Sequence, residues 1–395
     1  MARRAPGGRV APGLPPTPAT IAGDVPASSH PIAGSQEPPR PAVKALVALS
    51  GGVDSSVAAA LLIEAGHEVA GVTLVQTCRP AGDGGGCCCD PGDARRVAEQ
   101  LGIPHTTLDY TDLFCREVIR PFVTAYQSGL TPNPCVECNR RVRFGALLAE
   151  ADRLGFDLLA TGHHARIWRD SQGRHLRRGA DPEKDQSYVL FMLGQRHLAR
   201  LAFPIGEITK VEVRRRARAL GLSSAERAES QDLCFVGRGG YREFLRGQLP
   251  ESHAPGPIVD TAGREIGRHS GVAGFTVGQR RGLGVATGEP RYVVAVRPDT
   301  ATVVVGRRED LLAAGCRVGG MSWVAGAPPE GGGLEAKVRY RSPAAAAQAE
   351  PGDGEEWRVW FDEPQAAVTP GQAAVLYRGD EVVGGGTILA ALPGR

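Results

Sequence analysis

Hydrophobic and polar positions follow two different periods along the first half of the chain. Four short, mostly apolar runs have the length of buried parallel strands, and four longer stretches repeat their apolar residues at helical spacing. The expected strands are 44–49, 68–75, 105–108 and 157–160, and the expected helices are 53–65, 93–101, 112–127 and 140–154. This alternation predicts an α/β doubly wound parallel sheet, whose ligands bind at the carboxyl ends of the strands.

Three further elements are expected before residue 237. They are an apolar helix at 189–193, a basic helix at 209–220 and a strand at 229–235 that contains Cys234. The basic helix carries Arg214, Arg215, Arg216 and Arg218. Its charge fits either a face that meets phosphates or a merely solvated face, and both interpretations stay open.

After about residue 238 the pattern changes to short strands separated by turns. Residues 336–340, 357–361, 373–377 and 382–388 recur at intervals of roughly 10 to 15 residues, which predicts a C-terminal antiparallel β-barrel. Residues 1–42 are rich in Pro, Ala, Gly and Ser without periodicity, which predicts disorder. We therefore expect a tail (1–42), a nucleotide-binding and catalytic domain (43–237), a central domain (238–318) and a barrel (319–395).

The first strand leads into a loop with the properties of an anion site. Ser50-Gly51-Gly52 follows the strand, and a helix is expected from Val53. The backbone N–H groups of such a helix start converge on one point, where the glycines allow close approach of a ligand. Hydroxyls of Ser50 and Ser55 add donors, and the Asp54 carboxylate suits Mg²⁺. The loop lacks the lysine of the Walker pattern and resembles the loop that binds pyrophosphate in enzymes that split ATP into AMP and pyrophosphate.

The cysteines supply the second candidate chemistry. Nine cysteines occur in a chain with no secretion signal, which argues against a structural disulfide framework. Cys135 and Cys138 lie in Thr131–Asn139, where two prolines predict an extended approach and Asn139 is expected to cap the following helix. A helix N-terminus beside Cys138 favours its thiolate. A redox pair, half of a zinc site, cluster ligands and plain loop cysteines all remain possible interpretations of Cys-x-x-Cys.

Composition narrows the class of partner. The net charge of +3 is weak, so a nucleic-acid partner has to be argued from local patches. No apolar run approaches the length of about 20 residues that a membrane helix needs. No targeting signal is apparent. We expect a cytoplasmic protein that does not contact membranes.

Taken together, residues 44–391 closely resemble the bacterial tRNA-specific 2-thiouridylases, which are tRNA-uridine 2-sulfurtransferases of the pyrophosphate-loop ATPase superfamily. The resemblance rests on motifs that occur in one order: Ser50–Ser56, Thr131–Asn139, Thr161–Arg166, Lys184–Tyr188, Ser230–Gly237, Gly267–Gly271, Thr276–Gly284, Lys337–Arg341 and Thr369–Gln372. It implies ATP-dependent replacement of the C2 oxygen of the wobble uridine by sulfur, in tRNAs for Lys, Glu and Gln. It also implies an adenine nucleotide hydrolase-like domain followed by a central domain and a barrel.

The resemblance also implies roles for individual residues. Cys234 would carry a persulfide, and Cys138 would be the nucleophile that resolves the intermediate, leaving a Cys138–Cys234 disulfide. The implied nucleotide contacts are Ala48, Leu49, Ser50, Gly51, Gly52, Val53, Asp54, Ser55, Leu74 and Gly162. The implied tRNA contacts are Asn133, Pro134, Cys135, His163, Lys184, Asp185, Gln186, Arg339, Tyr340 and Gln372. The implied cofactors and partners are ATP, Mg²⁺, tRNA and a sulfur donor, either a cysteine desulfurase or a sulfur-relay protein, and a monomer is expected.

One position departs from part of the family. Some members have aspartate where this chain has Cys135. The cysteine completes a set of three thiols, Cys135, Cys138 and Cys234, which could instead hold a [4Fe–4S] cluster with one iron open to bind sulfide. Two rival functions are a pyrophosphate-loop ligase, which needs neither cysteine, and a non-catalytic tRNA-binding sulfur carrier, against which Asp54 and both cysteines argue.

Overall fold

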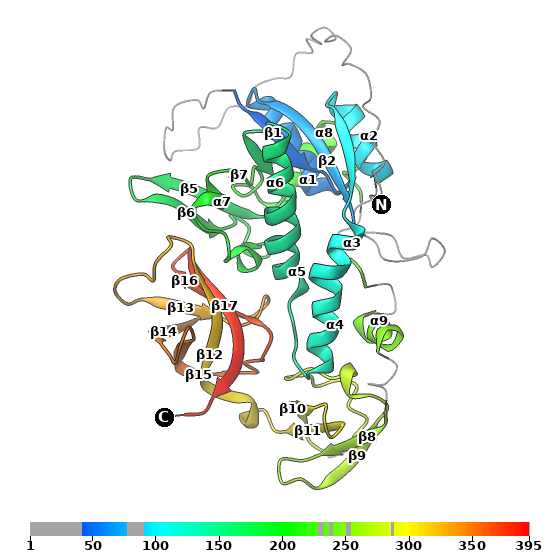
Figure 1. Cartoon of the computed structure of the whole chain (residues 1–395), viewed down its shortest axis with the longest axis vertical. Coiled ribbons are helices and arrows are strands. Elements are labelled where there is room, and N and C mark those ends of the chain that lie inside the picture. The colour runs from blue at the N-terminus through cyan, green and yellow to red at the C-terminus, as the bar shows by residue number, and fades with distance from the viewer. Residues whose placement is uncertain are drawn as a thin grey trace, which may run out of the picture. The chain divides into compact units, whose positions relative to one another are not determined.

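The computed structural model describes residues 42–76, 91–227, 233–236, 240–249, 254–285 and 288–394. Ala42–Arg395 form one compact unit. The expected N-terminal tail lies outside the described residues, and so do three consecutive cysteines, Cys87, Cys88 and Cys89. The described residues form three sheets, of five, four and eight strands (Figure 1).

The first sheet confirms the predicted doubly wound architecture. Its strands lie in the order β3-β2-β1-β4-β7, and neighbouring strands are parallel throughout. Their bounds are Lys44–Ala48 (β1), Glu68–Val75 (β2), His105–Asp109 (β3), Leu158–Ala160 (β4) and Leu201–Ala202 (β7). The order runs outward from β1 in both directions, so β1 is the topological switch point, beside which such sheets bind ligands.

Helices cover both faces of this sheet. On one face, α1 (Val53–Glu64) and α2 (Pro91–Leu101) pack on β1 through Ala59 and Ala94. On the other face, two longer helical stretches pack on β1 and β2 through Phe114 and Val142. These stretches are α3 (Thr111–Phe114), η1 (Cys115–Ile119) and α4 (Arg120–Gln127), then α5 (Pro134–Glu137), η2 (Cys138–Leu147) and α6 (Leu148–Arg153). Helix α8 (Lys210–Ala219) packs on α1. The shorter helical elements are η3 (Ser187–Leu190) and α7 (Gln195–Leu198).

The helix that carries the Cys-x-x-Cys pair begins earlier than the sequence suggested. It starts at Pro134 instead of Arg140, and its N-cap is Asn133, whose Oδ1 accepts a hydrogen bond from the Cys135 N–H at 3.1 Å. Asn139 is buried inside the helix and donates Nδ2–H to the carbonyl of Val189 at 3.0 Å. The expectation was wrong because a proline at the first helical position has its fixed φ already suited to the helix and lacks an N–H that would need a partner. The π-helical segment η2 therefore begins at Cys138, inside the helix.

Two other expected elements differ. The apolar run 189–193 is not an α-helix. Ser187–Leu190 form one 3₁₀ turn, and the whole run is buried, so its apolar character reflects position in the core. Residues 233–235, the described part of the expected strand 229–235, belong to a turn, in which Phe235 packs its ring against Phe114 and Phe122.

The second sheet has the order β10-β11-β8-β9 and forms the centre of the chain. Its strands are Gly256–Val259 (β8), Glu265–His269 (β9), Tyr292–Arg297 (β10) and Thr302–Gly306 (β11), with the short turns η5 (Val272–Gly274) and η6 (Glu309–Leu311) beside them. Helix α9 (Gly240–Gln248) precedes it and packs Leu245 against Phe122 of α4.

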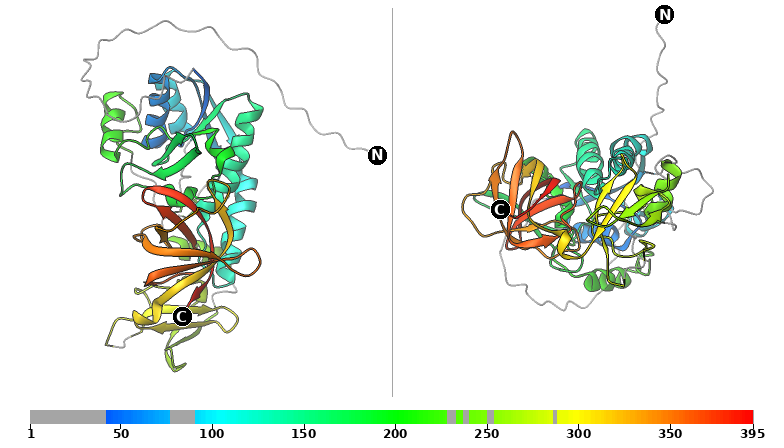
Figure 2. Two further views of the ribbon diagram at one scale, coloured as in Figure 1. Left: turned by 90° about the vertical axis from the view of Figure 1, so that its left-hand side faces the viewer. Right: turned by 90° about the horizontal axis from the view of Figure 1, so that it is seen from below.

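The third sheet contains the predicted antiparallel barrel, whose strands run from yellow to red in Figure 2. Its order is β12-β15-β14-β13-β16-β17, and a further pairing of β12 with β17 closes it. The strands are Leu312–Trp323 (β12), Leu334–Lys337 (β13), Ala345–Pro351 (β14), Trp357–Ala366 (β15), Ala373–Arg378 (β16) and Glu381–Leu392 (β17).

The sequence did not reveal a hairpin that extends this sheet. Strands β5 (Ala165–Asp170) and β6 (Gly173–Arg178) follow β4 directly, and β6 pairs antiparallel with β17. The barrel sheet therefore continues into a hairpin that belongs, in sequence, to the nucleotide-binding part. No helix in the described ranges is long and apolar enough to cross a membrane.

Candidate active site

The Ser50 loop has the geometry of an anion site. Gly51 has φ of +76°, the left-handed conformation that glycine adopts without strain. The hydroxyls of Ser55 and Ser56 both donate to the Gly52 carbonyl, at 3.1 and 2.9 Å, and the Ser50 N–H donates to Ser55 Oγ at 3.2 Å. These bonds fix the turn while the first backbone N–H groups of α1 remain directed out of the helix.

A second loop touches the first through backbone atoms, as the shared sheet edge predicts. Gly162 follows β4, and a Cβ atom added to it would lie 2.6 Å from the Ser55 nitrogen and 2.7 Å from the Asp54 carbonyl carbon. Only glycine lets the two loops approach this closely. The structure therefore brings together Gly162 and the Ser50–Ser55 loop.

Asp54 has two basic partners that the sequence interpretation missed. Lys210 Nζ lies 2.7 and 2.6 Å from the two carboxylate oxygens, and His164 Nε2 lies 3.3 Å from Oδ1. Burial acts to raise the pKa of Asp54, but the hydrogen bond from His164 and the charge of Lys210 outweigh it, so the pKa is lower than usual. The only signal in the sequence was the position of Lys210 directly after Thr209, the N-cap of α8. Lys210 is 156 residues away from Asp54 along the chain, so this signal did not point to the contact.

Arg227 is a second missed cation at this loop. Its guanidinium donates to the Gly51 carbonyl at 3.1 Å and to Asp93 at 2.5 Å. The Arg227 cation thus contacts the loop directly before the start of α1. The site is electrostatically suited to a phosphate group.

The fit of the two implied metal groups differs. A magnesium ion bridging nucleotide phosphates needs only one or two protein carboxylates, and Asp54 can be one of them. An iron–sulfur cluster needs a converging set of thiolates. In the part of the chain that the structure describes, no group of three or more His, Cys, Asp or Glu side chains is arranged to hold a metal ion. Cys135, Cys138 and Cys234 therefore do not fit the cluster in this structure, and we derive no step through it.

Apart from Val53, which is buried at the start of α1, three of the implied nucleotide contacts have apolar side chains. Leu49 and Leu74 are buried in the cores on opposite faces of the sheet, and Ala48 is half-buried. Their side chains pack against other apolar side chains. Contact between these positions and a nucleotide would therefore run through the backbone, at the carboxyl ends of β1 and β2.

The loop before the Cys-x-x-Cys pair is held by the barrel. The Thr131 N–H donates to the Pro370 carbonyl at 2.9 Å, and Gln372 Nε2 donates to the Thr131 carbonyl at 2.8 Å. Gly371, with φ of +92°, is so close that a Cβ atom would lie 2.9 Å from the Thr131 nitrogen. In the structure Gln372 thus positions the segment that leads to Asn133, Pro134 and Cys135.

The two cysteines with implied sulfur chemistry lie on one apolar cluster. Cys138 is 7% exposed and belongs to the cluster that also contains Leu74 and Phe114, and half-buried Cys234 packs against that cluster. Both are thiols in this structure, as are exposed Cys135 and buried Cys316, whereas Cys115 is disulfide-bonded. The structure thus brings Cys234 to the side of the sheet that carries Cys138.

The Lys184-Asp185-Gln186 segment supports the loop that follows β4. Buried Asp185 accepts hydrogen bonds from the N–H groups of Gly179 and Ser187, at 3.1 and 3.0 Å, and Gln186 Oε1 accepts one from the His164 N–H at 2.9 Å. Lys184 is half-buried beside them. Contacts of these three residues with tRNA stay a prediction.

His163 is buried, with Nδ1 at 2.7 Å from Thr161 Oγ1 and Nε2 at 3.4 Å from an Arg143 nitrogen. Burial first, and then the Arg143 charge, lowers the pKa of His163 to about 3. Its contact with tRNA also stays a prediction, and any such contact would involve a neutral imidazole.

We expect His163 to stay neutral from pH 5 to pH 8. In the unfolded chain it would take up a proton below about pH 6.5, so its burial lowers stability as the pH falls from there toward 3. An NMR titration of the His163 ring, assigned with His163→Gln, should show constant chemical shifts between pH 5 and pH 8. A midpoint near pH 6 would contradict this expectation.

Arg339 and Tyr340 follow strand β13 of the barrel. Arg339 donates to the Val277 carbonyl at 2.9 Å and to Thr369 Oγ1 at 3.2 Å. Burial first, and then the charges of Asp185 and Cys135, raises the pKa of Tyr340, whose side chain is nevertheless 37% exposed. Tyr340 is therefore placed to offer an aromatic face near Cys135.

Neighbouring carboxylates neutralise much of the positive charge of the basic helix α8. Glu212 pairs with Arg215 and Arg216, and Glu226 pairs with Arg218. These ion pairs favour the interpretation of a solvated face over that of a phosphate-binding face.

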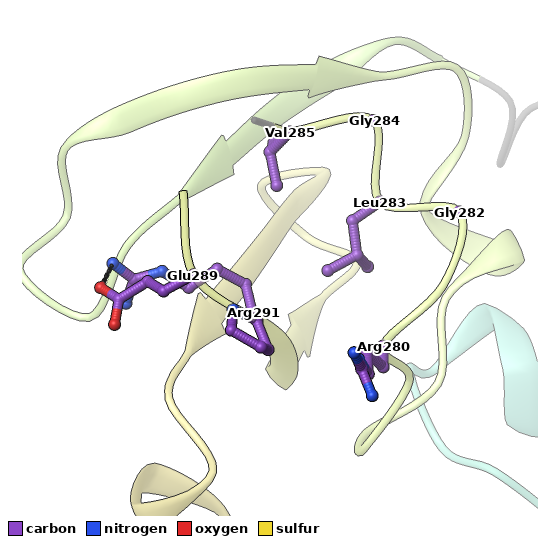
Figure 3. A pocket seen from close by; sticks show the side chains of 8 residues that line it. Arg280, Gly282, Leu283, Gly284, Val285, Glu289 and Arg291 are labelled. Atoms are coloured by element: carbon purple, nitrogen blue, oxygen red, sulfur yellow. Dashed lines mark hydrogen bonds and ion pairs between the residues drawn. The ribbon is translucent and has the colours of Figure 1, made fainter. Parts of the chain in front are cut away.

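A cavity of about 400 Å³ lies in the central part of the chain, away from the Ser50 loop. Leu283, Val285 and Arg280 line it, together with an ion pair of Glu289 and Arg291 at 2.7 Å (Figure 3). None of the residues implied in catalysis lines this cavity. The chemistry-bearing groups are at the sheet edge instead, so we place the candidate active site there.

Comparison with protein families gives three matches, which together cover most of the chain. Residues 43–238 match the family described as tRNA methyl transferase HUP domain, and residues 242–307 match the tRNA methyl transferase PRC-barrel domain. Residues 313–388 match the aminomethyltransferase beta-barrel domain.

Comparison with individual proteins gives more specific relatives. The chain is 51% identical to the tRNA-specific 2-thiouridylase MnmA of Moorella thermoacetica over 351 residues, covering 87% of this chain and 98% of that protein. It is 54% identical to the tRNA-specific 2-thiouridylase MnmA of Chloroflexus aurantiacus over 350 residues, covering 87% and 97%. Among solved structures, the U34-tRNA thiolase NcsA from Methanococcus maripaludis with its [4Fe-4S] cluster matches with a TM-score of 0.31 and 20% identity, covering 54% of this chain and 67% of that chain.

Proposed function

The chain belongs to the tRNA-specific 2-thiouridylase family, whose members are tRNA sulfurtransferases, and from this we propose that it replaces the C2 oxygen of the wobble uridine by sulfur, using ATP. The proposed substrates are the tRNAs for Lys, Glu and Gln. One observation supports this reaction above all others. A phosphate-binding helix start and a cysteine-bearing helix are built onto the same parallel sheet, with Cys138 in the apolar cluster that Leu46 and Leu74 of the neighbouring strands share.

Sulfur transfer fits the site better than methyl transfer, which the descriptions of two matching families mention. Methyl transfer needs neither a pyrophosphate loop nor a pair of thiols. Exchange of a carbonyl oxygen for sulfur needs both kinds of group, because the oxygen must first become a leaving group and the sulfur must arrive as a nucleophile. The Ser50 loop and the Cys138/Cys234 pair supply these two requirements.

We infer that the first step activates the uridine. The C2 oxygen attacks the α-phosphorus of ATP, the bond to the β-phosphate oxygen breaks, and pyrophosphate leaves. The N–H groups and hydroxyls of Ser50–Ser55 bind the pyrophosphate part and stabilise the negative charge that develops on it. Ala48, Leu49, Leu74 and Gly162 contact the rest of the nucleotide. A bound Mg²⁺ would neutralise phosphate charge beside Asp54.

The second step transfers sulfur from a persulfide on Cys234. Its terminal sulfur attacks C2, and AMP leaves with the former C2 oxygen. The Cys138 thiolate then attacks Cys234 Sγ, the bond between Cys234 Sγ and the transferred sulfur breaks, and 2-thiouridine is released, leaving a Cys138–Cys234 disulfide. A thiol reductant must supply two electrons before the next turnover, and a cysteine desulfurase or a sulfur-relay protein must renew the persulfide.

The proposed tRNA site surrounds these cysteines. A uridine has to leave its stack to reach the sheet edge, and it then needs hydrogen-bonding and stacking partners. Asn133, Pro134 and Cys135 lie at the start of the helix that carries Cys138, and Cys135 is near enough to Tyr340 to raise its pKa. The exposed ring of Tyr340 is the proposed stacking partner of the uridine. Further contacts are proposed for His163 and Arg339, for Lys184, Asp185 and Gln186, and for Gln372, which also fixes the Thr131 segment.

The purified chain should convert the wobble uridine to 2-thiouridine only when ATP, a persulfide donor and a reductant are all present. One AMP and one pyrophosphate should form for each sulfur transferred, because each activation cleaves one ATP between its α- and β-phosphates. Mass spectrometry of the tRNA nucleosides together with quantification of AMP tests this stoichiometry. Thiolation without ATP, or formation of ADP in place of AMP, would refute the proposed reaction.

A further inference from the structure

Gln76 is a buried side chain at the carboxyl edge of the parallel sheet. It directly follows β2, and it is only 3% exposed. Neither Oε1 nor Nε2 of Gln76 has a hydrogen-bond partner within the part of the chain that the structure describes. A buried amide gives up its hydrogen bonds with water, so an amide with both ends unpaired lowers the stability of the fold. The position therefore suits a ligand that supplies the two missing partners.

The direction of the Gln76 side chain follows from the alternation of side chains along β2. Leu74 belongs to the apolar cluster that contains Cys138, whereas Val69 packs on the opposite face, beneath α1 and α2. The strand stays extended up to Val75. Since every second side chain of a strand lies on the same face, Gln76 lies on the face of Leu74. This is the face of the sheet that carries the cysteines.

The amide of Gln76 matches the hydrogen-bonding edge of a nucleobase. Its Oε1 is an acceptor and its Nε2 carries donor hydrogens, and an amide can pair with a base edge through both atoms at once. On a uracil ring, N3–H is a donor and the neighbouring O4 is an acceptor. Pairing with these two atoms leaves the C2 oxygen, on the other side of N3, free to react.

The groups already proposed around the uridine do not supply this pair of hydrogen bonds. Oδ1 of Asn133 accepts the Cys135 N–H as the cap of the helix, and Tyr340 is the proposed stacking partner. Adenine also offers a donor beside an acceptor. The Ser50–Ser55 loop, however, leads into α1, which packs on the face of the sheet opposite to Gln76. The uridine has to reach the cysteines, so it is the base on the side of Gln76.

We propose that Gln76 binds the uracil ring of the target nucleotide, with Oε1 accepting a hydrogen bond from N3–H and Nε2 donating one to O4. This inference rests on the proposed thiolation of the wobble uridine. The two bonds hold the ring in its plane while the C2 oxygen remains available for its attack on ATP. A base that has left its stack thereby recovers hydrogen bonds that it loses with its surroundings. Gln76 is thus a substrate-binding residue at the end of β2.

A double-mutant cycle between Gln76 and the base tests this contact. One change is Gln76→Met, which keeps the length of the side chain and removes the amide. The other is removal of the wobble base from a tRNA for Glu. The unchanged chain should bind the intact tRNA at least about tenfold more tightly than the abasic tRNA, because stacking and two hydrogen bonds are lost together. Gln76→Met should bind the intact tRNA about tenfold more weakly than the unchanged chain does, and the abasic tRNA equally well.

Two further measurements separate base binding from a structural role. Gln76→Met should unfold at the same urea concentration as the unchanged chain or at a higher one, because the substitution removes a buried amide that has no partner among the described residues. Calorimetric titration should show unchanged affinity for ATP. Gln172→Met, at an exposed glutamine in the turn between β5 and β6, is the matched control and should bind both tRNAs normally.

Three outcomes would overturn the inference. Equal weakening for intact and abasic tRNA, or a lower urea midpoint, would indicate a structural role of Gln76. Weaker binding of ATP without a change for either tRNA would assign the amide to adenine. Thiolation by the unchanged chain distinguishes these results from failure of the proposed function. If the unchanged chain forms 2-thiouridine and the cycle shows no coupling, only the role of Gln76 is wrong, whereas a chain that forms no 2-thiouridine refutes the proposed function itself.

Discussion

Replacing Cys234 with serine is expected to lower the rate of tRNA thiolation by about a thousandfold or more, because no other group would carry the persulfide. Cys138→Ser should cause a loss of similar size, since the transferred sulfur would stay bonded to Cys234. Neither change touches the Ser50 loop, so both variants should still adenylate the tRNA. Exchange of labelled pyrophosphate into ATP, measured with tRNA present, should therefore remain close to normal while 2-thiouridine is absent.

Cys135→Ser is the matched variant for this prediction. Cys135 lies three residues before Cys138 on the same helix, and it is exposed. In the persulfide mechanism it contacts the substrate but carries no sulfur, so its loss should reduce thiolation by about tenfold or less. Full activity of Cys234→Ser would refute the persulfide assignment. If Cys135→Ser, Cys138→Ser and Cys234→Ser all lost thiolation completely, the result would favour a site that needs three thiolates.

Replacing Gly162 with alanine is expected to weaken nucleotide binding strongly. The added methyl carbon would lie 2.6 Å from the backbone nitrogen of Ser55 and 2.7 Å from the Asp54 carbonyl carbon. Backbone atoms cannot swing aside as a flexible side chain does, so the Ser50 loop or the end of β4 must shift. We expect ATP binding to weaken by at least about tenfold and the free energy of unfolding to fall by about 1–3 kcal/mol.

Gly194→Ala is the control for this substitution. Gly194 precedes α7 with an ordinary negative φ, and a Cβ atom there would meet no atom within 4 Å. Gly194 is the N-cap of α7, where glycine is favoured over alanine, so we expect a loss of stability of about 1 kcal/mol or less and normal ATP binding. Urea unfolding and calorimetric titration with ATP measure both quantities. Normal nucleotide affinity in Gly162→Ala would show that the contact between the two loops is not needed for binding.

The sequence predicted those parts of the site whose residues lie close together along the chain. An apolar strand, two glycines and a helix start occur within a few residues at Ser50–Ser56, so their relative placement follows from the chain itself. Gly162 could also be placed, because carboxyl ends of parallel strands share one edge. The helix start at Pro134 was misjudged although the signal was local. A proline there fits both an extended segment and a first helical turn, and the side-chain acceptor of Asn133 favours the latter.

The missed groups depend on contacts over long distances in sequence. Lys210 meets Asp54 across 156 residues, and Arg227 meets Gly51 across 176. The sequence around Lys210 or Arg227 contains no pattern that would predict its contact with the Ser50 loop. The β5–β6 hairpin was missed for a similar reason. Its residues are largely charged, and the strand that stabilises it, β17, lies some 200 residues further along the chain.

The β5–β6 hairpin joins the catalytic part and the barrel into one continuous sheet, because its strand β6 pairs with β17. Arg177 and Leu176 of β6 lie opposite Glu381 and Val382 of β17, and His175 contacts Glu381 at 2.7 Å. If the chain were divided before or after the central sheet, β6 would be in one fragment and β17 in the other. Each fragment would then present an unpaired strand edge, the feature through which sheet proteins associate wrongly with one another. A different barrel in this place would cover the edge of β6 only if it offered a strand that pairs with Leu176 and Arg177.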